Sequence, residues 1–249
     1  QLVPLTFFAE RYGSAKSSIS EDLTIIKETF EQRGIGLLTT VPGAAGGVKY
    51  IVKSNLEEAH SFINEMCDIM TEPNRILPGG YLYMNDILGN PQVMKKVGRL
   101  IASIYAEKQI DVIMTVATKG IPIAYAIADY LNVPVVIVRP DNKVTEGPTV
   151  SINYISGSSK RIQTMLLSKR SLEVGSKVLV VDDFMKAGGT INGMKSLLDE
   201  FNATVAGIAV LIESSDREER LVDNYVSLLK LAEVDEREKQ IQVTKGNYF

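Results

Sequence analysis

The order of apolar and polar residues predicts two helices at the start of the chain. Pro4 suits the first turn of a helix, and the apolar residues after it predict a helix to about Tyr12. A second helix is predicted to begin near 14–16 and to end with Gly34 as its C-cap. Its apolar residues recur at helical spacing: Ile19, Leu23, Ile26 and Phe30.

A hairpin and a third helix are predicted next. Two strand-like stretches, 36–41 and 48–52, enclose a Pro- and Gly-rich loop that is typical of a hairpin. Helical spacing then returns, and Pro73 ends it. We therefore divide the chain into three parts: a domain at 1–53, a linker helix at 54–72 and a second domain at 73–249.

The second domain alternates between apolar strands and helices. Strands are predicted at about 112–116, 133–138, 149–155, 162–167, 177–181 and 205–211. Helices are predicted at about 92–107, 120–131 and 189–201. Continuously apolar strands that are separated by helices indicate a sheet buried on both faces. The fold class is therefore α/β, with a mostly parallel sheet flanked by helices and a ligand site at the carboxyl ends of the strands.

Composition narrows the chemistry that the chain can carry. Its 249 residues include one His (His60), one Cys (Cys67) and no Trp. This excludes a site with two histidines, an internal disulfide and a zinc cage of several cysteines, and no metal site is predicted. Few cysteines fit a reducing compartment, so we expect a cytoplasmic protein, and no apolar run is long enough to span a membrane. The chain begins at Gln1 rather than Met, and we expect that an N-terminal segment is missing.

The net charge of −3 would by itself argue against a simple basic nucleic-acid-binding domain. The acidic excess is local, however, because the linker helix contains acidic residues and no basic ones: Glu57, Glu58, Glu65, Asp68 and Glu72. The net charge therefore does not exclude DNA binding by the first domain.

The strongest local signal is a buried strand that ends in Asp182 and Asp183 and is followed by a loop and a helix. Backbone N–H groups of a Gly-rich loop at a helix start can bind a phosphate, and Thr190 adds a hydroxyl donor. The two carboxylates can accept hydrogen bonds from ribose hydroxyls. The alternative is a strand end with solvated acids and an ordinary Gly turn.

This stretch resembles the phosphoribosyl-pyrophosphate (PRPP) motif of type I phosphoribosyltransferases. The resemblance implies PRPP contacts from the whole motif: Asp182, Asp183, Phe184, Met185, Lys186, Ala187, Gly188, Gly189 and Thr190. Residues 115–124 look like the pyrophosphate loop of that family, with Ala117, Thr118, Lys119 and Gly120 as contacts. The polar region 139–160 looks like the mobile flap, with Arg139, Lys143, Ser158 and Arg161 in or beside it.

The motif departs from that of the enzymes at one position. Hypoxanthine-type members carry an Asp in the loop as the base for the purine proton, and Lys186 stands there in this chain. A protonated Lys cannot take up that proton, so we expect ligand binding without turnover. Two alternatives remain open: an active purine phosphoribosyltransferase, perhaps xanthine-like, and a nucleotide sensor with no DNA role.

The first domain has the element order of most of a winged helix (α+β). A winged helix would contact DNA through the start of its second predicted helix and through the wing. The candidate DNA contacts are Lys16, Ser17, Ser18, Ser20 and Lys49. The alternative is a small structural or dimerisation subdomain.

A winged helix joined to a phosphoribosyltransferase-like domain resembles the purine-operon repressors of Gram-positive bacteria. The stretches that carry the resemblance span nearly the full chain: 4–8, 15–26, 41–50, 75–81, 116–122, 141–154 and 178–193. By this resemblance the missing segment includes the first helix of the winged domain.

Membership of this family implies a homodimeric repressor, without transferase activity, that binds double-stranded DNA at the control regions of purine biosynthesis and transport genes. PRPP, with or without Mg²⁺, would act as the inducer, and the guanosine alarmone ppGpp would compete with it and favour DNA binding. No cofactor would be required. Tyr81 and Phe184 are candidates either to contact a purine or to pack in the core.

Overall fold

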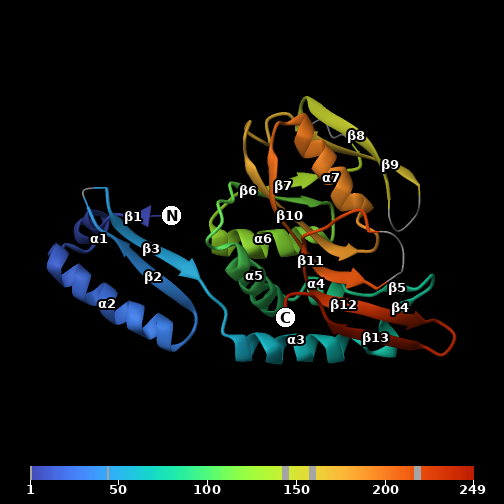
Figure 1. Cartoon of the computed structure of the whole chain (residues 1–249), viewed down its shortest axis with the longest axis horizontal. Helices are drawn as coiled ribbons and strands as arrows, with labels where there is room; N and C mark the ends of the chain where they lie inside the picture. Colours follow the sequence, from blue (N-terminus) through green and yellow to red (C-terminus); the bar gives the residue numbers. More distant parts are fainter. Residues whose placement is uncertain (1, 44, 142–145, 157–160, 216–219) are drawn as a thin grey trace.

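The computed structural model describes residues 2–43, 45–141, 146–156, 161–215 and 220–249. Figure 1 shows two parts, because the first helices and strands form a lobe of their own beside the elements that surround the central sheet. Helix α3 (Leu56–Met70) follows directly after the N-terminal lobe and runs along the larger part.

The N-terminal lobe combines two helices with a small antiparallel sheet of order β1-β3-β2. Its elements are β1 (Leu2–Val3), α1 (Leu5–Tyr12), α2 (Lys16–Gln32), β2 (Gly36–Val41) and β3 (Gly47–Val52). Both predicted helices and the hairpin are confirmed, but Gly34 is not the C-cap. Arg33 holds that position, and Gly34 follows it with a φ of 60°, a left-handed conformation that glycine adopts most easily.

Helix α3 is anchored at its start and along one face. The Asn55 side chain accepts hydrogen bonds from the backbone N–H groups of Glu57 and Glu58, which gives the helix an N-cap. Its buried face packs into the core of the larger part: Ala59, Phe62, Ile63, Met66 and Met70. The acidic residues lie on the opposite, solvated face, as the predicted amphipathic pattern requires.

The larger part contains a six-stranded sheet of order β13-β12-β11-β10-β6-β7, in which only β13 is antiparallel to its neighbour. The strands are β6 (Val112–Val116), β7 (Val135–Val138), β10 (Lys177–Met185), β11 (Thr204–Ser214), β12 (Val226–Asp235) and β13 (Gln240–Lys245). The predicted α/β class and mostly parallel sheet are therefore confirmed.

Helices cover both faces of this sheet, as Figure 1 shows. Leu179 and Val181 of β10 pack in one core with α5 (Pro91–Tyr105) and α6 (Gly120–Leu131). Val178 and Val180 pack in a second core with α7 (Gly189–Glu200). This alternation along one strand explains why its sequence is continuously apolar.

Two hairpins and short helical segments complete the larger part. They are η1 (Pro73–Arg75), β4 (Ile76–Leu77), β5 (Tyr81–Leu82), α4 (Asn85–Leu88), β8 (Thr149–Ile155) and β9 (Ile162–Ser168). β4 pairs with β5, and β8 pairs with β9, both antiparallel. Among the helices that the structure describes, none combines the length and the apolarity that a bilayer crossing needs.

Several predicted boundaries were wrong. β10 continues past 181 to Met185, because Asp182 and Phe184 still pair with Val210 and Ile212 of β11. The strand predicted from 133 begins only at Val135, after Asn132 ends α6 in a left-handed conformation. Strands β1, β4, β5, β12 and β13 were not predicted.

Candidate functional site

A cavity of about 710 Å³ lies at the carboxyl end of β10, between the β4–β5 hairpin and the start of α7. Eleven of the predicted ligand contacts line it: Tyr81, Ala117, Lys119, Asp182, Asp183, Phe184, Met185, Lys186, Gly188, Gly189 and Thr190. Thr118, Gly120 and Ala187 belong to the same two loops but are not in the lining. The fold thus brings the two phosphate-type loops of the sequence to one cavity.

The two acidic residues of this cavity lie side by side on β10. Asp182 is only 4% exposed, and its Oδ1 accepts a 2.9 Å hydrogen bond from the backbone N–H of Asp183. Burial raises the pKa of both carboxyl groups, and the Asp183 charge raises that of Asp182 further. The Lys119 charge acts in the opposite direction on Asp183. Carboxylates so poorly solvated gain from hydroxyl donors that a ligand brings into the cavity.

The loop before α7 has a conformation that requires glycine. Gly188 is the N-cap of α7 and has a φ of 87°. A Cβ atom there would lie 2.8 Å from Cγ2 of Val222, so a larger residue would also displace a buried neighbour. The backbone can therefore approach a ligand closely at the positive end of the α7 dipole, which favours an anion such as a phosphate.

A second loop, residues 117–120, meets the first across the cavity. It joins the end of β6 to α6, and Lys119 is the N-cap residue of α6. A side chain at Gly120 would collide with the buried hydroxyl of Thr115. Because Lys119 lines the cavity at a helix start, this loop adds a second place where negative charge is stabilised.

Sequence reasoning missed half of the residues that line the cavity, among them Tyr154 and Gln163 of the β8–β9 hairpin. The Tyr154 hydroxyl donates a 2.8 Å hydrogen bond to Oε1 of Gln163, and Tyr154 also makes a side-chain hydrogen bond with Thr190. Burial is the main cause of the raised pKa of Tyr154. Period-two alternation could have found this residue, because Val150, Ile152 and Tyr154 face the same core.

Part of the cavity wall is apolar. Leu77, Pro78 and Tyr81 of the β4–β5 hairpin face the same cavity as Phe184 and Leu231, and Tyr81 is 59% exposed. The Gly79 N–H of this hairpin donates a 3.2 Å hydrogen bond to the Glu236 side chain, and this contact helps to fix the position of the hairpin. Such a wall suits a flat, apolar ring next to the polar half of the cavity.

Of the predicted flap residues that the structure describes, neither Arg139 nor Arg161 is in the lining of this cavity. The Arg139 side chain pairs with Glu146 at 3.4 Å, and its backbone pairs with Leu166 of β9. Arg161 is exposed, and its carbonyl accepts a hydrogen bond from Ser156. Lys143 and Ser158 lie outside the described residues.

The candidate DNA contacts occupy two places on the N-terminal lobe. Lys16, Ser17, Ser18 and Ser20 are all exposed and lie in the first turns of α2. Lys49 is half-buried in β3, the central strand of the small sheet, where it pairs with Leu2 and Thr39. The polar side chains at the start of α2 are thus exposed to solvent, whereas Ile19 between them is buried.

Comparison with known proteins decides the family. Residues 1–52 match the model of the bacterial purine repressor N-terminal domain, and residues 84–244 match that of the phosphoribosyl transferase domain. The chain is 68% identical over 249 residues to the purine biosynthesis transcriptional repressor PurR of Bacillus subtilis (strain 168), covering 100% of this chain and 87% of that protein. The chain belongs to the bacterial purine repressor family.

Relatives in the purine repressor family differ in the direction of regulation. The purine biosynthesis transcriptional activator PurR of Lactococcus lactis subsp. lactis (strain IL1403) is 52% identical over 249 residues, with coverage of 100% of this chain and 92% of that protein. Of these two relatives, the repressor has the higher sequence identity to this chain.

The larger part of this family member has the fold of phosphoribosyltransferase enzymes. The crystal structure of adenine phosphoribosyltransferase from Thermoanaerobacter pseudethanolicus matches it with a TM-score of 0.58 and 21% identity, and covers 67% of this chain and 99% of that chain. The fold is thus shared with enzymes, whereas both full-length relatives described above are regulators.

Proposed function

We propose that the chain is a DNA-binding transcriptional repressor of purine biosynthesis and transport genes, and that PRPP in the β10–α7 cavity relieves repression. The observation that carries this proposal is the joining of a repressor-type N-terminal domain to a cavity that is lined by the buried Asp182 and the half-buried Asp183. The proposed repressor is a homodimer that works in the cytoplasm, where bacterial DNA is found.

Each part of PRPP has a matching part of the cavity. The carboxylates of Asp182 and Asp183 accept hydrogen bonds from the ribose hydroxyls, and the 5-phosphate binds at the start of α7 beside Thr190. The diphosphate binds the 117–120 loop, where Lys119 adds positive charge. Among the described residues no cluster of His, Cys, Asp or Glu is arranged to hold a metal ion, so Mg²⁺ would enter with the phosphates.

The apolar wall supports ppGpp as a competing ligand. Its ribose and phosphate groups would use the polar half of the cavity, and its guanine would lie against Tyr81 and Phe184. Because the two ligands would share one cavity, only one binds at a time. PRPP lowers DNA affinity only if it binds the low-affinity conformation more tightly, and ppGpp must prefer the other.

Lys186 supports binding without turnover. It lies in the cavity lining at the loop position where hypoxanthine-type enzymes need a base, and a Lys that is protonated cannot accept the purine proton. Its charge instead favours a polyanionic ligand. The alternative is an active purine phosphoribosyltransferase, perhaps xanthine-like, which is supported by the eleven predicted ligand contacts that line the cavity.

One titration tests the proposal. The DNA dissociation constant for a purine-gene control region is measured at fixed salt with no ligand, with PRPP and with ppGpp. We expect PRPP to weaken DNA binding at least about fivefold, within the usual range of allosteric coupling, and ppGpp to reverse this effect. Unchanged DNA affinity with saturating PRPP would overturn the inducer role. Release of pyrophosphate from PRPP and xanthine, hypoxanthine or guanine would establish the enzyme alternative.

A further inference from the structure

One side chain of the larger part holds the N-terminal lobe at two points. Nε of Arg99, on α5, donates a 2.9 Å hydrogen bond to the carbonyl of Lys53, directly after β3. Its Nη2 donates a 2.9 Å hydrogen bond to the carbonyl of Gly34, which follows Arg33, the C-cap of α2. Both acceptors are main-chain groups, so these contacts fix the backbone at the two ends of the β2–β3 hairpin. Only the planar fork of arginine offers donors in this arrangement.

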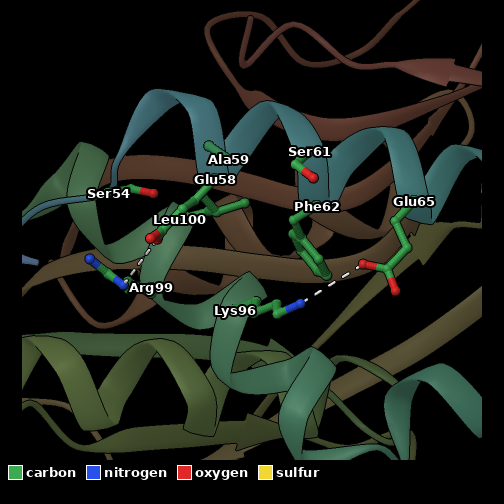
Figure 2. Close-up of a pocket in the computed structure, with 9 residues that line it drawn as sticks. All are labelled: Ser54, Glu58, Ala59, Ser61, Phe62, Glu65, Lys96, Arg99 and Leu100. Carbon is green, nitrogen blue, oxygen red and sulfur yellow. Dashed lines mark ion pairs between the residues drawn. The ribbon is translucent and has the colours of Figure 1, made fainter. Parts of the chain in front are cut away.

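Figure 2 shows Arg99 at one end of a groove between α3 and α5. Two ion pairs cross this groove of about 280 Å³, Arg99 with Glu58 and Lys96 with Glu65, each with an N–O distance of 3.8 Å. The glutamate side chains are about two-thirds exposed, at 65% and 61%. Ion pairs as exposed as these contribute little to the stability of the fold. The two carbonyl contacts are what distinguishes Arg99 from Lys96.

The helix that carries Arg99 is packed tightly against α6. A side chain at Gly98, the neighbour of Arg99, would collide with the backbone of Ala126 on α6. Close backbone contact of this kind leaves no room for one helix to move without the other. Burial raises the pKa of Tyr130, near the C-terminal end of α6, and the Arg99 charge lowers it.

Helix α6 begins next to the ligand cavity, because its N-cap residue Lys119 lines that cavity. Its first residue is Gly120, and a Cβ atom there would lie 3.6 Å from Cα of Asp182. The cavity loop 117–120, α6, α5 and Arg99 thus form a continuous chain of packed elements from the proposed PRPP site to the backbone of the N-terminal lobe.

We propose that Arg99 is the positioning residue of this repressor: it fixes the DNA-binding lobe on α5 and transmits a shift of α6 at the PRPP site to that lobe. This inference rests on the proposed function for the transmission step. The positioning step stands on the contacts of Arg99 alone.

Trypsin tests the positioning step without any ligand. It cleaves after Arg33, the residue before Gly34, and after Lys53. Arg99 binds the carbonyl groups of Gly34 and Lys53. In the full chain we expect Arg99→Met to be cut at Arg33 or Lys53 at least about tenfold faster than the wild type. The matched control is Lys96→Met, which changes the neighbouring cation of the same groove and leaves both carbonyl contacts. A general loss of stability would instead also speed cleavage at Lys108 and Lys177, in the larger part.

DNA and PRPP titrations test the transmission step on the same proteins. We expect Arg99→Met to keep PRPP affinity within about twofold while the ratio of DNA dissociation constants with and without PRPP falls toward one. Lys96→Met should keep the wild-type ratio. The inference is overturned if Arg99→Met keeps the wild-type ratio. It is also overturned if trypsin cuts Arg99→Met at Arg33 and Lys53 at the same rates as the wild type. If the wild type itself shows no PRPP response, the proposed function fails, and the tryptic rates still decide whether Arg99 positions the lobe.

Discussion

The Glu213 carboxylate on β11 accepts a 2.6 Å hydrogen bond from Nη2 of Arg220, and the two form a largely buried ion pair. Glu213 also accepts hydrogen bonds from the hydroxyls of Tyr225 and Ser227, each at 2.7 Å. Next to Arg220, the Leu221 N–H donates a 2.9 Å hydrogen bond to the carbonyl of Ala187 in the loop before α7. The Glu213 cluster therefore supports the proposed ligand loop from behind.

Glu213→Gln should destabilise the protein and loosen this support. The amide replaces one acceptor oxygen with a donor, so at least one of the three converging donors loses its partner in a buried site. Breaking a buried pair of this kind costs about 3 kcal/mol. We expect a lower unfolding midpoint and weaker PRPP binding, measured by calorimetry. Tyr225→Phe removes one donor and keeps the Arg220 pair, so its effects should be smaller; equal effects of the two variants would contradict this account.

Asp182→Asn should stabilise the unliganded protein while it weakens PRPP binding. Burial and the Asp183 charge raise the pKa of Asp182 in the folded state. A carboxyl with a raised folded-state pKa contributes stability that is present at low pH and is lost as the pH rises through that value. Removal of the charge should therefore raise the unfolding midpoint at neutral pH by about 2–4 °C for each kcal/mol of relieved cost.

The pH dependence provides the check on this sign. We expect the advantage of Asp182→Asn to disappear in acid, where the wild-type carboxyl is protonated, and PRPP affinity to fall at least about tenfold at neutral pH because a charge-assisted acceptor is lost. Asp199→Asn, at an exposed position of α7, is the control and should change neither quantity. Thermal unfolding at several pH values and calorimetric titration measure both.

Gly188→Ala should damage the ligand loop through backbone strain and crowding. An alanine in the left-handed region costs about 1–2 kcal/mol, and its Cβ would press on Val222. We expect a lower unfolding midpoint and loss of PRPP affinity of at least about tenfold. Gly175→Ala is a matched control, because Gly175 has a φ of 82° with no atom within 4 Å of a Cβ. It should lose stability and keep PRPP affinity; a similar affinity loss in both variants would remove the loop from the proposed site.

The sequence predicts those elements best whose apolar period is long and whose ends carry a turn residue. Strands β6 and β8 have the predicted bounds, and the two phosphate-type loops meet at one cavity as expected. The end of β10 was missed, because Asp182 and Asp183 look like a solvated strand end, whereas the strand continues beside β11 to Met185 and Asp182 is buried in it. Such a tertiary effect has no local signal.

The contacts that join distant segments were equally out of reach. Tyr154 and Gln163 enter the cavity because β8 and β9 pair, and Arg99 meets Gly34 because α5 lies beside the N-terminal lobe. Strand β12 has apolar residues interrupted by Ser227 and Lys230, and its length and partners depend on β11 and β13. Local patterns place residues on an element, and only the assembled sheet decides which elements meet.

Lys16→Ala should weaken DNA binding in a way that salt reveals. Lys16 is the exposed first residue of α2, where it could pair with a phosphate of the DNA backbone. Removing one such contact lowers affinity for all sequences alike and reduces the slope of log affinity against log salt by about one. Fluorescence anisotropy at several salt concentrations measures this slope for the full-length repressor.

Lys27→Ala supplies the comparison on the same helix. Lys27 is also exposed, but it lies three turns further along α2 and faces Glu31 at 4.0 Å. If the start of α2 is what meets the DNA, this variant should keep the wild-type slope while Lys16→Ala loses about one unit of it. Equal slopes in both variants would place the DNA elsewhere on the lobe, because the electrostatic term counts only charges that lie close to a phosphate.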